Sequence, residues 1–354
     1  MRKQRNLSLE WIKLGAAVLV VFIHIPMAGT AGGVAKCLAR CGVPLFFAIS
    51  GYYAFGAGAE RLFQRLLHSL RLMLGANLLY LLFECWEVRA KGWEIAGYLK
   101  KTLTLQALAK VLITGESPFM FHLWFLSALV FCYLVLWLYV RFYQEETPRF
   151  SPLYAAGAGL LGVGVYLDTF CDFNTLGEAQ LDSITFRNGL YLGLPMFLLG
   201  LFLHEHRARL MAAWRWTPRR SVGFILLGFA LSLVQWFGAG KANLPLGMLL
   251  VVPELLLLSH AFPDMARAPA LLRWAAPWAG RVSTVVYITH VLISRIAMIY
   301  KDSSPFWSFI YRGRDHIPFA GWVAILSVAF GVLWCALGGV VGWVRRRGDG
   351  NRHA

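Results

Sequence analysis

Charged residues are scarce in this chain. Lys, Arg, Asp and Glu together make up 15% of its 354 residues, whereas a soluble globular domain carries roughly 25%. Hydrophobic residues make up 58%, and the mean hydropathy is +0.58. A water-soluble protein of this length would lack the polar surface that its folded shape must expose. The composition therefore excludes a soluble protein and favours one whose solvent is lipid.

The sequence shows no soluble domain, long linker or strong internal repeat. The first apolar run is too long for a cleavable signal peptide and has no convincing cleavage site behind it, so we expect it to remain as a first helix. The inverted repeat of many transporters is not evident either. Residues 1–354 are therefore predicted to form a single membrane domain.

CxxC motifs are missing as well, although the chain has six cysteines. Cys37 and Cys41 lie four residues apart near a predicted outer loop. A disulfide or a metal pair is one interpretation, and small apolar filler is the favoured one. No metal site is predicted.

The formal net charge of +16 does not predict a nucleic-acid partner. The Lys and Arg residues lie in short links between apolar runs, not on one amphipathic face or in a tail. Basic links beside a membrane set topology and contact lipid headgroups. Membrane lipid is therefore the expected partner.

About ten apolar segments are long enough to cross a bilayer, for which a helix needs roughly 20 residues. Helix is the expected state because unpaired backbone groups are too costly in lipid. A further apolar stripe at 103–113 is expected to lie at the outer interface. The predicted spans are Leu9–Gly29, Gly42–Ala59, Leu66–Trp86, Phe121–Phe142, Leu153–Phe170, Asn188–Leu203, Val222–Phe237, Leu244–His260, Val282–Ile299 and Phe319–Val344.

The distribution of basic residues predicts the orientation. With the N-terminus inside, the inner links are rich in Arg, whereas the outer link after the fifth span carries Asp168, Asp172, Glu178 and Asp182. An even number of spans also places Arg345–Arg347 inside. The predicted fold is an all-α, polytopic membrane helix bundle with both termini in the cytoplasm.

Lys13 and His24 are the most informative pair in the first span. They are eleven residues apart, so they share one helix face and lie roughly 16 Å apart along the axis. Lys13 could instead snorkel to the inner headgroups, and His24 could be a satisfied structural histidine. Because histidine suits general-base work near neutral pH, His24 is the catalytic candidate.

The second span places Ser50 and Gly51 in mid-membrane. Small residues there predict either tight helix packing or the wall of a substrate channel. The inner link that follows carries Arg61, Arg65 and Arg71 at helical spacing. Ordinary positive-inside bias explains these residues, and an anion site for phosphates is the functional alternative.

Ionisable and polar groups in the later spans are further candidates, because such groups are costly in lipid. The carboxyl group of Glu254 would have to be neutral or paired with an Arg or a His. The other candidates are His122 and Trp124 at the start of the fourth span, Arg187 before the sixth, and Tyr287 and His290 on the polar stripe of the ninth.

These motifs together resemble the acyltransferase 3 family of bacterial membrane acyltransferases over nearly the whole chain. That family has a basic residue, ten intervening positions and a histidine in its first helix, and then a Gly-x-x-x-Phe-Phe-x-x-Ser-Gly element. The matching residues here are Lys13 and His24, then Gly42, Phe46, Phe47, Ser50 and Gly51, and a late Tyr-x-x-His at Tyr287 and His290.

The resemblance implies transfer of an acyl group, often acetyl, from cytoplasmic acyl-CoA to a hydroxyl of a lipid-linked or cell-surface carbohydrate. Acyl-CoA would be a co-substrate, with no bound cofactor. His24 would act as general base, or as the carrier of an acyl intermediate. Tyr287 or His290 would stabilise the oxyanion. The CoA end would be held by Lys13, Arg61, Arg65 and Arg71.

The resemblance also implies a location in the inner or plasma membrane of a bacterium. A second interpretation is a transporter of a small solute such as an amino acid, because similar helices form the membrane domain of membrane-bound serine racemases. In that case the polar stripe would line a permeation path.

Overall fold

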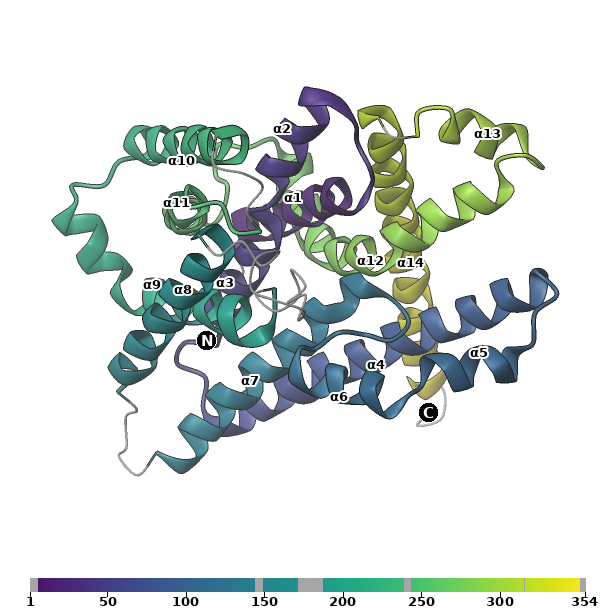
Figure 1. The fold of residues 1–354 in the computed structure, drawn as a ribbon. Helices are drawn as coiled ribbons and strands as arrows, with labels where there is room; N and C mark the ends of the chain where they lie inside the picture. Colours follow the sequence, from purple (N-terminus) through teal and green to yellow (C-terminus); the bar gives the residue numbers. More distant parts are fainter. Residues whose placement is uncertain (1–5, 144–148, 171–186, 239–242, 315, 351–354) are drawn as a thin grey trace. The chain divides into compact units, whose positions relative to one another are not determined.

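The computed structural model describes residues 6–143, 149–170, 187–238, 243–314 and 316–350, and within these ranges it contains helices and no strand (Figure 1). The chain divides into two compact units. The first unit comprises residues 1–42 and 258–354, and the second comprises residues 43–257. That the whole chain forms a single membrane domain stays a prediction.

The first unit is built around three long helices. Helix α1 packs against α12 and α14, and α12 and α14 pack against each other. At one crossing, Gly331 of α14 lies against the side chain of Val282 on α12. The helices of this unit are α1 (Leu7–His24), α2 (Gly29–Ala39), α12 (Ala270–Tyr300), α13 (Pro305–Tyr311) and α14 (Ile317–Gly350).

The second unit contains the remaining helices and pairs α4 with α7 and α8 with α9. Its elements are α3 (Gly42–Ala54), α4 (Ala59–Ala90), α5 (Ile95–Thr102), α6 (Leu105–Ile113), η1 (Phe121–Leu123), α7 (Trp124–Phe142), α8 (Ser151–Phe170), η3 (Gly189–Gly193), α9 (Leu194–Ala213), α10 (Pro218–Gly238) and α11 (Met248–Ala261, the end of which belongs to the first unit).

The prediction of an all-α, multi-pass fold is confirmed. Each predicted span is occupied by a helix, and within the described residues seven segments are long and apolar enough to cross a membrane. Of the remaining predicted spans, α8 and α9 are not among the seven, and α11 is a shorter apolar helix of 14 residues that contains Pro253. The structure therefore supports seven membrane crossings within the described residues, and the orientation of the chain in the membrane stays a prediction.

The first span ends earlier than predicted. Helix α1 stops at His24 rather than at Gly29, because Pro26 disfavours the helical conformation at Ile25, whose backbone is extended (φ −89°, ψ 128°). A second helix, α2, then follows where an outer loop was expected. Cys37 and Cys41 are buried and both thiols are free, which supports the interpretation as apolar filler.

Glycine permits one close helix crossing in the second unit. A Cβ atom on Gly51 of α3 would collide with the carbonyl group of Phe197 on α9, and one on Gly200 would collide with the carbonyl group of Ala48. The two backbones therefore touch at a reciprocal pair of glycines, as small residues allow in membrane helix pairs.

Candidate active site

His24 lies at the point where α1 ends, and its ring contacts His290 of α12. The two imidazole ring centroids are 5.3 Å apart and the ring planes are inclined by 29°. The side chain of His24 is half-buried, whereas His290 is fully buried. The structure therefore brings together two sequence candidates from opposite ends of the chain, within the first unit.

Backbone carbonyl groups fix the tautomer of His290. Its Nδ1 atom lies 2.8 Å from the carbonyl oxygen of Tyr287 and 3.1 Å from that of Val286. Because carbonyl oxygens only accept hydrogen bonds, Nδ1 carries a hydrogen atom, and when the ring is neutral it is Nε2 that presents the lone pair. His290 is thus held with one defined ring orientation beside His24.

Lys13 forms an ion pair that was not predicted from the sequence. Its Nζ atom lies 3.5 Å from Oε1 of Glu10, and the side chain of Glu10 is only 5% exposed. The signal was present in the sequence, since an acid three positions before a lysine shares its helix face. The side chain of Lys13 is therefore held in place by the buried carboxylate of Glu10 as well as by its own helix.

Hydrogen bonds anchor the start of α1 within the first unit. The side chain of Asn6 accepts a hydrogen bond from the backbone of Leu9 at 3.0 Å, as an N-cap does, and donates to the carbonyl oxygen of Ser259 at 3.0 Å. The indole of Trp11 donates to the carbonyl oxygen of Leu272 at 3.0 Å. These bonds hold the start of α1, and with it the helix that carries Lys13 and His24, against α11 and α12.

Tyr287 is a further site candidate in the first unit, and it lies next to His290. It is buried, and its ring centroid lies 6.3 Å from that of His290. One turn before it, Ser283 is also buried and donates to the carbonyl oxygen of Gly280 at 2.9 Å. The polar stripe predicted on this helix therefore faces protein within the described structure.

In the second unit, Ser50 and Arg65 belong to one cluster. The hydroxyl of Ser50 donates to the carbonyl oxygen of Phe46 at 2.8 Å, and Arg65 donates to that of Tyr53 at 2.8 Å. The buried hydroxyl-bearing side chain of Tyr133 lies beside both Ser50 and Arg65. Arg65 thus binds a carbonyl group at the C-terminal end of α3, whereas the neighbouring Arg61 and Arg71 are exposed.

Gly51 supports the packing interpretation of its motif, because its backbone abuts α9 as described above. His122 is buried at the start of the fourth span and meets the ring of Tyr80 edge-on at 5.2 Å. Trp124, also buried, lies against the ring of Phe47 at 6.1 Å. These aromatic contacts join α4 to η1 and α3 to α7.

Arg187 is half-buried beside a small recess that it shares with Asp168, Tyr191 and Asn243. The carboxylate of Asp168 accepts from the backbone of Asn243 at 2.7 Å and from its side chain at 2.8 Å. Next to Arg187, the side chain of Asn188 accepts from the backbone of Leu190 at 2.8 Å and so caps η3. The sequence predicted Arg187 as a candidate, but it did not predict that Asp168 shares its recess.

Glu254 is buried, and within the described residues its carboxyl group accepts a hydrogen bond from neither an Arg nor a His. The donor to its Oε2 atom is the indole of Trp216, at 3.1 Å. The hydroxyl of Ser221 also donates to the backbone carbonyl oxygen of Glu254 at 3.3 Å. Glu254 therefore ties the link after α9 to α11 within the second unit.

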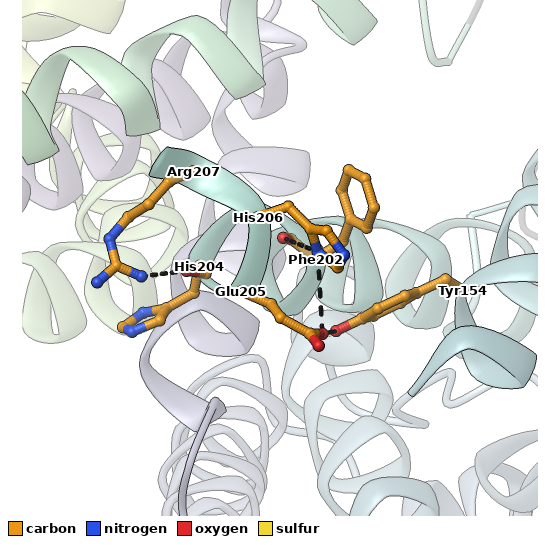
Figure 2. A network of polar contacts seen from close by, with 6 residues as sticks. All are labelled: Tyr154, Phe202, His204, Glu205, His206 and Arg207. Carbon is orange, nitrogen blue, oxygen red and sulfur yellow. Dashed lines mark hydrogen bonds and ion pairs between the residues drawn. The ribbon is translucent and has the colours of Figure 1, made fainter. Parts of the chain in front are cut away.

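A further polar network lies on the second half of α9, where the sequence reads His204-Glu205-His206-Arg207 (Figure 2). The hydroxyl of Tyr154 donates to Oε2 of Glu205 at 2.5 Å, and Nδ1 of His206 lies 3.9 Å from the same atom. Only the positive charge of this run was used in predicting the topology. Within the described residues, no group of three His, Cys, Asp or Glu side chains is placed to hold a metal ion.

Comparison with known proteins decides the family. A family model described as an acyltransferase domain, that of the acyltransferase 3 family, matches residues 6–341. The chain belongs to this family. None of the curated proteins and none of the solved structures gives a match to this acyltransferase. The resemblance drawn from Lys13, His24 and the Ser50-Gly51 element is therefore confirmed at the level of the family, and the protein is a multi-pass membrane acyltransferase.

Proposed function

We propose that this acyltransferase moves an acyl group, in the simplest case acetyl, from cytoplasmic acyl-CoA to a hydroxyl of a cell-surface or lipid-linked carbohydrate. The observation that carries the proposal is the contact between His24 and the buried ring of His290. A half-buried imidazole with a defined ring orientation at a helix break is suited to proton transfer.

In this proposal the acceptor hydroxyl attacks the thioester carbonyl carbon while His24 accepts the hydroxyl proton. The new carbon–oxygen bond forms, the carbon–sulfur bond breaks, and the proton returns from the imidazolium to the departing CoA sulfur. The carbonyl groups in the last turn of α1 stabilise the transient imidazolium, because they concentrate partial negative charge there. An acyl group carried on His24 is the alternative route.

The tautomer of His290 favours Tyr287 over His290 as the residue that stabilises the oxyanion. The neutral His290 ring presents an acceptor at Nε2, since its Nδ1 hydrogen is directed at backbone carbonyl groups. The phenolic hydroxyl of Tyr287 is a donor, and it is therefore our choice for stabilising the developing oxyanion. His290 then acts as a positioning residue that holds the ring of His24.

Binding of the anionic CoA end is assigned to Arg61, Arg71 and Lys13. Arg61 and Arg71 are exposed on the first half of α4, and Arg side chains suit phosphate groups. Arg65 is a weaker candidate, because its guanidinium group already donates to the carbonyl group of Tyr53.

The test is an assay of the purified protein with labelled acetyl-CoA, longer acyl-CoA esters and a glycan extract of the membrane. The proposal expects label to enter the glycan fraction and stoichiometric release of CoA thiol. A matched assay in vesicles without any acyl donor measures uptake of labelled amino acids. Uptake without a donor, together with no transfer from any acyl-CoA, would favour the transporter and reject the proposed reaction.

A further inference from the structure

The surface of the second unit carries an open groove between α8 and α9. Its walls are apolar, with the small residues Ala155, Gly157 and Ala158 on α8 facing Leu198 and Phe202 on α9, and it encloses about 420 Å³. The hollow lies over small residues of α8, whose side chains leave room between the two helices. The catalytic candidates do not line this groove.

The dimensions of the groove suit a hydrocarbon chain. From Tyr154 to Leu161 the groove follows α8 for about 10 Å, at roughly 1.5 Å per residue. One leaflet of a bilayer contributes roughly 15 Å of hydrocarbon. The groove can therefore hold about two thirds of one acyl chain of a lipid.

One end of the groove is aromatic and polar. Tyr154 and Phe202 close this end, and their rings meet edge-on at 5.3 Å. The ring of His206 stacks on Phe202 at 4.5 Å, and Tyr154 points to Glu205 (Figure 2). An occupant with an apolar chain in the groove would place its polar head beside Glu205 and His206.

Charges of both signs stand at this polar end. The side chain of Glu205 is 35% exposed, so its carboxylate remains accessible to a cation. Arg209 follows one turn later on the same face of α9, is exposed, and makes no hydrogen bond or ion pair within the part of the chain that the structure describes. Arg207 and His204 lie on the opposite side of α9 and do not contribute (Figure 2).

We propose that the α8–α9 groove binds one acyl chain of phosphatidylethanolamine, with the lipid ammonium group at Glu205 and its phosphate at Arg209. The pair of opposite charges matches a zwitterionic headgroup, in which each contact is a charge-assisted hydrogen bond. A purely anionic phosphatidylglycerol headgroup would face the carboxylate of Glu205 without a cation to offer it. The predicted orientation, with the Arg-rich end of α9 inside, places this lipid in the inner leaflet.

The test is native mass spectrometry of the full chain released from nanodiscs that contain equal amounts of phosphatidylethanolamine and phosphatidylglycerol. The wild-type protein should retain phosphatidylethanolamine in preference to phosphatidylglycerol. Ala155→Phe, which fills the groove, should retain about tenfold less of it, a change of roughly 1.4 kcal/mol in binding. Ala158→Leu gives the same test with a smaller side chain if Ala155→Phe does not fold.

Two matched variants make the outcome specific. Ala156→Phe is the control, because Ala156 is exposed on α8 but does not line the groove, and it should bind lipid as the wild type does. Glu205→Gln should still bind lipid but lose the preference for phosphatidylethanolamine. Equal retention of both lipids by the wild type, retention of some other lipid instead, or equal losses in the Ala155 and Ala156 variants would overturn the proposal.

Discussion

The imidazole ring of His24 lies stacked on that of His290, at a centroid distance of 5.3 Å. His290 cannot turn freely, because two backbone carbonyl groups of its own helix hold Nδ1. The ring at the end of α1 is therefore positioned by a residue near the other end of the sequence.

Removing the ring of His290 should lower turnover. We expect His290→Ala to reduce kcat on the order of tenfold with little change in KM for acyl-CoA, because a misplaced base affects the transition state and not the binding of the donor. His290→Phe should restore part of kcat, since a phenyl ring can keep the stack. Steady-state kinetics, with the melting temperature recorded for each variant, checks the prediction. Unchanged kcat in a folded His290→Ala variant would contradict it.

The ion pair between Glu10 and Lys13 should influence donor binding. Glu10→Gln keeps the shape of the side chain but removes the charge that holds Lys13 at 3.5 Å. We expect KM for acyl-CoA to rise a few-fold, about 1 kcal/mol in binding, with a smaller effect on kcat. The control is Glu94→Gln, an exposed acid in the link before α5. An equal effect of both substitutions would reject a specific role for Glu10.

Close packing of α3 on α9 should make Gly51 and Gly200 intolerant of a methyl group. Each substitution to Ala is expected to cost about 1–3 kcal/mol in the free energy of unfolding, because the new Cβ atom would meet a backbone carbonyl group. Gly159→Ala on α8 is the control, since nothing lies within 4 Å of the position that its new methyl group would occupy. Thermal unfolding in detergent separates the two cases, and equal melting temperatures for all three variants would argue against the crossing.

The buried carboxyl group of Glu254 should depend on the indole of Trp216. Trp216→Phe removes the donor and leaves Oε2 without this hydrogen bond, at an expected cost of about 1–3 kcal/mol in the free energy of unfolding. In a Glu254→Leu background the same substitution should cost clearly less, because there is no buried oxygen to leave unsatisfied. Additive effects in this double-mutant cycle would show that the two side chains do not interact.

The sequence was sufficient for the fold class and for the family, because both depend on patterns that are local in the chain. Apolar runs of membrane length predict the helices, and the Lys13–His24 spacing with the Ser50-Gly51 element predicts the family. The end of α1 at His24 was also readable in principle, since Pro26 disfavours helix at the preceding residue.

Apart from the local ion pair between Glu10 and Lys13, the missed features depend on contacts between residues that are further apart in the chain. No local pattern in the sequence indicates that His290 contacts His24 or that Trp216 donates to Glu254. The same holds for the hydrogen bond from Arg65 to the carbonyl group of Tyr53. The hollow on α8 depends on which face of the helix α9 covers. Glycine and alanine in the sequence are equally consistent with tight packing and with an open groove.

The role of His24 as the base is tested most directly by the rate of acyl transfer in purified, folded His24→Ala protein. If His24 accepts the proton of the acceptor hydroxyl, transfer of label from acyl-CoA should fall by about 10²–10⁴-fold while KM for acyl-CoA and the melting temperature stay close to those of the wild type. Transfer at the wild-type rate by this variant would contradict the assignment of His24 as the base.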